Sequence, residues 1–98
     1  MSTNLIGCYQ AIEESSRKML DAARMKDWDA VVRYEGTCAV LIDELRQRAK
    51  SEALDVAARI EKMHIMQRIL KNDAQIRYLA EPWLAHCEQQ IEGKHLLH

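Results

Sequence analysis

The chain has 98 residues, of which 48% are hydrophobic and 30% are charged, with only three glycines and one proline. This composition is typical of a helical globular domain and excludes disordered and collagen-like chains. Fourteen basic and fifteen acidic side chains leave a net charge of −1, which provides no overall field to attract nucleic acid or an anionic membrane. We therefore expect one small all-α domain spanning residues 1–98, with a core of modest size.

The first two helices are predicted at residues 5–25 and 28–48. An apolar repeat at helical spacing follows Thr3 or Asn4, either of which can cap the first helix. Asp27 is the predicted cap of the second helix, because its carboxylate can accept hydrogen bonds from the free N–H groups of the first turn. Since only two residues separate the helices, they should be antiparallel neighbours.

The third helix is predicted at residues 52–80, with Ser51 as its capping residue. Pro82 lacks a backbone N–H, and its ring clashes with the carbonyl four residues earlier. The helix should therefore kink or restart at Pro82 into a short C-terminal segment, residues 82–92. The predicted architecture is an antiparallel three-helix bundle with a long third helix and this short final segment.

The three cysteines, Cys8, Cys38 and Cys87, are odd in number and widely spaced, which favours reduced thiols over a disulfide framework. The first residues lack the basic region and apolar run of a secretion signal. No stretch of the chain reaches the ~18 apolar residues that a membrane helix needs. These features predict a soluble, cytoplasmic protein.

Patterns that would indicate catalysis or metal binding are weak. The three glycines stand apart from one another, so they form no phosphate-binding loop. Basic residues that might converge on a dicarboxylate, as in small helical chorismate mutases, are better explained as solvated helix faces. The candidate metal ligands do not have standard ligand spacing; they are His86, Cys87, His95 and His98. We predict no enzymatic activity, no metal and no cofactor.

The third helix has two apolar faces. Successive side chains of a helix are turned by about 100° around its axis. One apolar line along the helix therefore consists of Ile65, Ile69, Ile76 and Leu79. A second apolar set lies well away from this line and consists of Met63, Met66 and Leu70. Either both faces are enclosed within the fold, or the second is offered to a partner helix, to which flexible methionines adapt well. Asp73 and Arg77, four residues apart near the second face, can form an ion pair that sets the register of a partner.

Two passages are similar to the FliT family of flagellar export chaperones: Lys26-Asp27-Trp28-Asp29-Ala30-Val31-Val32, and Ile69-Leu70-Lys71-Asn72-Asp73 followed by Ile76-Arg77. The resemblance runs in order from Leu5 to about Gly93. It implies a cytoplasmic bundle that binds the C-terminal helical segment of the filament-cap protein, keeps it unassembled and delivers it to the type III export gate. It also implies contacts with this client and with export ATPase components at Met66, Leu70 and Arg77.

We therefore predict that a client helix lies against the second and third helices. The predicted partner-binding residues are Val32, Leu41, Leu45, Met63, Met66, Ile69, Leu70, Asp73 and Arg77. The alternative is a helical adaptor or homodimerisation module, in which the second face pairs with its own copy. Some members of the FliT family, which this sequence resembles, also bind a flagellar transcription activator. Such binding would give the module a regulatory role.

Overall fold

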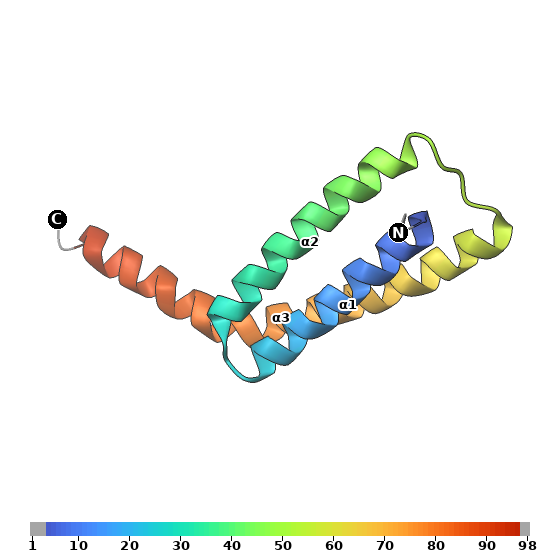
Figure 1. Ribbon diagram of the computed structural model, residues 1–98. Helices are drawn as coiled ribbons and strands as arrows, with labels where there is room; N and C mark the ends of the chain where they lie inside the picture. Colours follow the sequence, from blue (N-terminus) through green and yellow to red (C-terminus); the bar gives the residue numbers. More distant parts are fainter. Residues whose placement is uncertain (1–3, 97–98) are drawn as a thin grey trace.

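The computed structural model describes the backbone of residues 4–96 and the side chains of residues 4–82. Three α-helices follow one another: α1 (Leu5–Arg24), α2 (Trp28–Ala49) and α3 (Val56–Leu96). Helix α1 packs along both others and α2 runs antiparallel to them (Figure 1). Among the described residues, no Cα atom of α2 comes within 8 Å of a Cα atom of α3. The predicted all-α class and three-helix architecture are confirmed. The central position of α1 leaves α2 and α3 as two separate walls.

Both predicted N-terminal caps are present. The side-chain oxygen of Asn4 accepts a hydrogen bond from the Gly7 N–H at 2.8 Å. Asp27 Oδ1 accepts one from the Ala30 N–H at 3.2 Å. Each side chain thereby satisfies one of the N–H groups that have no partner within the first turn of a helix.

The turn between α1 and α2 contains a residue in a left-handed conformation. Lys26 has a φ of 59°. Its N–H donates to the Ala23 carbonyl at 3.0 Å, and the Asp27 N–H donates to the Ala22 carbonyl at 2.9 Å. This pair of hydrogen bonds is the Schellman ending of a helix, in which the left-handed position is usually glycine.

Replacing Lys26 by glycine is expected to raise the free energy of unfolding by about 0.5–1 kcal/mol, because the strain of a Cβ in the left-handed region exceeds the added flexibility of glycine. Urea unfolding followed by circular dichroism would measure the change. Lys26→Ala removes the same charge but keeps the Cβ, so this control should not be stabilised. Equal stability of the two variants would contradict the explanation.

The connection between α2 and α3 is longer than predicted. Helix α3 begins at Val56, where Asp55 Oδ1 accepts a hydrogen bond from the Ala58 N–H at 2.7 Å. Ser51 does not cap it; its hydroxyl donates to the Arg48 carbonyl at the end of α2, at 3.4 Å. Leu54 packs on the core within this connection. That tertiary contact accounts for the later start of the helix.

Of the two predicted outcomes at Pro82, a kink or a restart, the restart does not occur, because α3 continues through this residue as one helix to Leu96. A proline inside a helix removes one N–H donor to the carbonyl four residues before it, here that of Tyr78. Tyr78 is largely exposed, so water can hydrate this carbonyl in place of the missing donor. The last turns of α3 project beyond the other two helices (Figure 1).

The core lies between α1 and α3 in two clusters of buried residues: Leu5, Tyr9 and Ile65 in one, and Leu20, Ala23 and Ile76 in the other. Ile69 packs against the first cluster and Leu79 against the second. The first of the two predicted apolar lines of α3 therefore faces the core, and we call it the inner line. Its second apolar face remains outside this core, since Met63 and Leu70 are both exposed.

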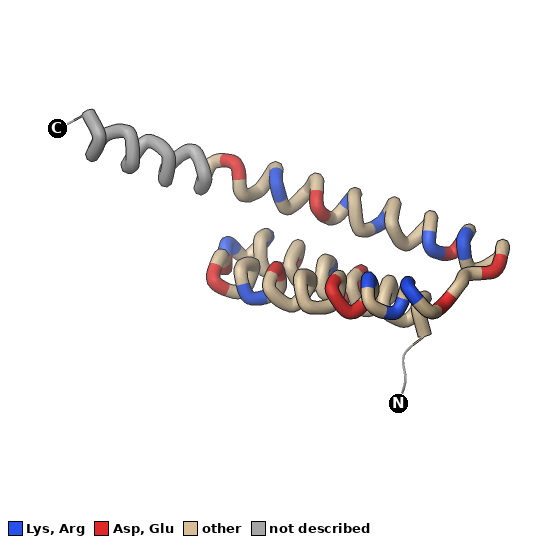
Figure 2. The backbone as a smooth tube through the Cα atoms, turned by 90° about the horizontal axis from the view of Figure 1, so that it is seen from above, with Lys and Arg blue, Asp and Glu red and all other residues tan. Residues whose placement is uncertain are grey.

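Polar side chains also join α3 to α1. Arg68 donates two hydrogen bonds to the Glu13 carboxylate, at 2.7 and 3.1 Å, and this pairing raises the pKa of Arg68. Further hydrogen bonds join Gln10 to Glu61 and Arg24 to Gln75. Basic and acidic residues are intermixed along the described helices (Figure 2). The charges thus serve to align α3 on α1 rather than to form a stripe of one sign.

Candidate partner-binding groove

An apolar groove of about 510 Å³ runs between α2 and α3, with α1 as its floor. The α2 wall consists of Trp28, Val31, Val32, Glu35, Cys38 and Ile42, and the α3 wall of Ile69, Leu70, Asp73, Ile76, Arg77 and Ala80. Ile12, Ser16 and Met19 form the floor. Because these residues come from the part of the bundle nearest the turn between α1 and α2, the groove occupies that half of the molecule. We call it the α2–α3 groove.

Helix α2 is held to the rest of the bundle near both of its ends. Trp28 and Val31 pack against the cluster that contains Leu20 and Ile76. Leu45 packs against the other cluster. Between these anchors no Cα atom of α2 comes within 8 Å of a Cα atom of α3, and the groove lies in the space between the two walls.

Five of the predicted partner-binding residues line this groove: Val32, Ile69, Leu70, Asp73 and Arg77. Val32 on the α2 wall is 58% exposed, and Leu70 on the α3 wall is 60% exposed. Large apolar side chains this exposed on both sides of one groove are typical of a protein interaction site.

The predicted ion pair is present on the α3 wall. Arg77 Nε lies 2.9 Å from Asp73 Oδ2, and the Arg77 side chain is 81% exposed. An exposed pair of this kind contributes little to stability. It is therefore available to reorganise around a charged partner.

The other predicted residues do not line the groove: Leu41, Leu45, Met63 and Met66. Leu45 belongs to the packing around Leu5, and Leu41 is half-buried further along α2. Met63 borders a separate hollow of about 540 Å³ with Leu5 and Leu54, while Met66 lies exposed one turn before Leu70. The groove occupies only one end of the bundle, and Leu45 and Met63 lie beyond it along their helices.

The α2 wall contains residues that the sequence reasoning missed. Trp28, Val31, Glu35, Cys38 and Ile42 line the groove, and they recur every three or four residues, which is the spacing of one helix face. The signal was present in the sequence. Glu35 interrupts the apolar stripe, which therefore did not stand out as a single surface.

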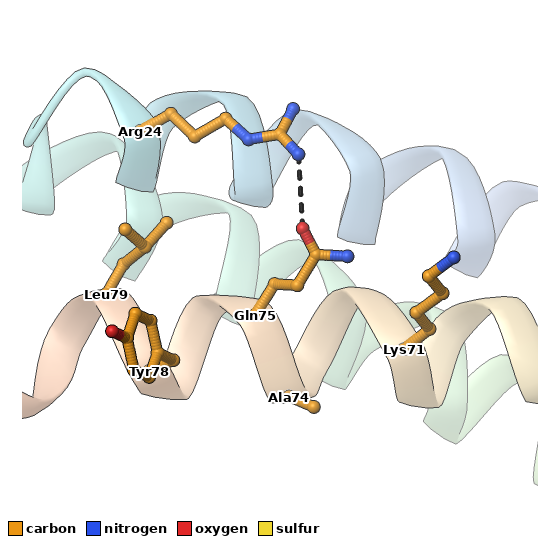
Figure 3. A pocket seen from close by; sticks show the side chains of 6 residues that line it. All are labelled: Arg24, Lys71, Ala74, Gln75, Tyr78 and Leu79. Carbon is orange, nitrogen blue, oxygen red and sulfur yellow. Dashed lines mark hydrogen bonds between the residues drawn. The ribbon is translucent and has the colours of Figure 1, made fainter.

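A smaller hollow of about 410 Å³ lies between α1 and α3 (Figure 3), lined by Arg24, Lys71, Ala74, Gln75, Tyr78 and Leu79. Arg24 Nη2 donates to Gln75 Oε1 across it at 3.1 Å. Lys71 and Tyr78 directly follow the groove residues Leu70 and Arg77 in the sequence, so this hollow uses a different face of α3. The α2–α3 groove remains the larger apolar surface.

The described side chains, from Asn4 to Pro82, contain no group of three or more His, Cys, Asp or Glu residues that could hold a metal ion. The candidate ligands His86, Cys87, His95 and His98 lie outside the described side chains. Within the described part of the chain, none of the helices combines the length and the apolar character needed to cross a bilayer.

Residues 6–93 match a protein family described as "Flagellar protein FliT". Over 89 residues the chain is 26% identical to the flagellar protein FliT of Photorhabdus laumondii, and the match covers 91% of this chain and 71% of that protein. The chain is also similar to the crystal structure of flagellar protein FliT from Bordetella bronchiseptica, with a TM-score of 0.75 and 36% identity. That similarity covers 88% of this chain and 98% of the other.

Proposed function

We propose, from the premise that this chain belongs to the FliT family of flagellar proteins, that it is a cytoplasmic, non-enzymatic chaperone of flagellar type III export. Its client is the C-terminal helical segment of the filament-cap protein. The chaperone prevents premature assembly of this client and delivers it to the export gate and its ATPase components.

The observation that carries the proposal is the open α2–α3 groove. Its walls come from two helices whose backbones are held apart, and they expose Val32 and Leu70 to solvent. An amphipathic helix laid between such walls buries its apolar face on both sides, which is the usual way in which a groove recognises a helix. Each Å² of apolar surface that binding removes from water contributes about 25 cal/mol of favourable free energy.

The physical properties of the groove suit a chaperone. An unassembled helical segment with an exposed apolar stripe tends to self-associate, and covering the stripe prevents this. Apolar contacts, including the flexible Met19 on the floor, adapt to a partner without a rigid set of polar interactions. Such a complex can be dismantled at the export gate.

We assign the client contacts to the predicted residues that line the groove: Val32, Ile69, Leu70, Asp73 and Arg77. Met66 extends this surface along α3, one turn before Leu70. Leu41 and Met63 belong to more distant parts of the proposed interface. Leu45 supports it indirectly, by holding α2 against the core.

Titration of the purified chain with a peptide from the C terminus of the cap protein tests this function. Light scattering should show a monomer that takes up one peptide, because a single client helix would contact both walls of the groove. A symmetric dimer of the free chain that takes up no peptide would instead support a homodimerisation module, and would contradict the chaperone proposal.

A further inference from the structure

Two carboxylates interrupt the otherwise apolar walls of the α2–α3 groove. Glu35 lies on the α2 wall and Asp73 on the α3 wall. Asp73 pairs with Arg77, whereas Glu35 makes no hydrogen bond or ion pair with the described residues. The groove therefore contains two negative charges and one positive charge.

Hydrogen bonds to two adjacent serines of α1 place the two carboxylates at similar levels along the groove. The hydroxyl of Ser15 donates a hydrogen bond to the Tyr34 carbonyl on α2 at 3.4 Å. The hydroxyl of Ser16 accepts one from the side-chain amide of Asn72 on α3 at 3.1 Å. Glu35 and Asp73 are the next residues along their helices. Because α2 and α3 are antiparallel, these two steps of about 1.5 Å run in opposite directions, so the two residues stand within one helical turn of each other on opposite walls.

A client helix in the groove would shield this level from water. Glu35 would then lose hydration without gaining a partner, and an unpaired carboxylate in an apolar interface is strongly unfavourable. Arg77 does not relieve this, because its highly exposed side chain pairs with Asp73 on the other wall. A cation supplied by the client at this level removes the penalty, and an acidic residue there increases it.

From the proposed chaperone function we infer that the client helix carries one lysine or arginine within its apolar stripe, and that this cation lies between Glu35 and Asp73. Apolar client residues three or four positions to either side would then meet the apolar parts of the walls. On one side these parts include Val31, Val32 and Ile76, and on the other Cys38, Ile42 and Ile69. The groove thus selects a basic residue at one defined position of an otherwise apolar face.

A double-mutant cycle tests this inference with the cap-protein C-terminal peptide as the probe. Glu35→Gln keeps the shape of the side chain and removes its charge. Each basic residue of the peptide is changed to glutamine in turn, and dissociation constants are measured at low and high salt. Asp43→Asn is the control, because Asp43 is an exposed carboxylate of α2 outside the groove and its loss changes the net charge equally.

Glu35→Gln should weaken binding by about 3- to 10-fold at low salt and reduce the salt dependence. Asp43→Asn should not do so. One basic peptide residue should couple to Glu35, so that its substitution weakens binding less in the Glu35→Gln variant than in wild type. A peptide that binds wild type but shows no such coupling would overturn this inference alone, whereas a peptide that does not bind wild type would overturn the chaperone function and this inference together.

Discussion

The Leu70→Asp variant is expected to fold normally and to lose capture of the cap-protein C-terminal peptide. Leu70 is 60% exposed in the free chain, so the substitution should change the free energy of unfolding by only about 0.5 kcal/mol. In the complex, the new carboxylate would lie in an apolar interface, on the same wall as Asp73. The cost of several kcal/mol corresponds to a loss of affinity of at least about 100-fold.

Pull-down and calorimetric titration would measure this loss, and circular dichroism would confirm the fold. Val40→Asp is a matched control, because Val40 is 69% exposed on α2 but lies outside the groove. It should bind the peptide as wild type does. Undiminished capture by Leu70→Asp would show that the client does not use the α2–α3 groove.

The largest effect on stability is expected from Ile65→Ala. Ile65 is 1% exposed and packs with Leu5 and Tyr9 between α1 and α3. Removing three carbon atoms there leaves a cavity, which typically costs about 2–5 kcal/mol. This is a large fraction of the roughly 5–15 kcal/mol that stabilises a domain, so α1 and α3 should separate at much lower urea concentration.

Ile60→Ala provides the same chemical change on the same helix at a residue that is 49% exposed. Urea unfolding of this variant should differ from wild type by about 1 kcal/mol or less. If the two alanine variants were equally stable, the packing between α1 and α3 would not be the main source of stability in this fold.

The features that depended on neighbouring residues were predictable from the sequence. The caps at Asn4 and Asp27 involve backbone groups three residues away. The Asp73 and Arg77 pair needs only one helical turn. The inner line of α3 follows from helical periodicity alone, because any core must take the face where apolar residues recur.

Features that depended on contacts between residues far apart in the chain were not predictable from the sequence. Leu54 packs on the core just before α3 starts at Val56, and α3 continues through Pro82. These are balances between small energies that no local pattern encodes.

The same division holds for the groove. The sequence determined three helices and the two apolar faces of the third, since each follows from spacing along one helix. The exposure of Val32 and Leu70 came from the tertiary structure. Only the tertiary structure decided that α1 lies in the centre, that α2 and α3 remain apart, and that Glu35 stands within one helical turn of Asp73 along the groove. Those relationships depend on how separate helices are aligned, and the contacts that align them join residues far apart in the chain.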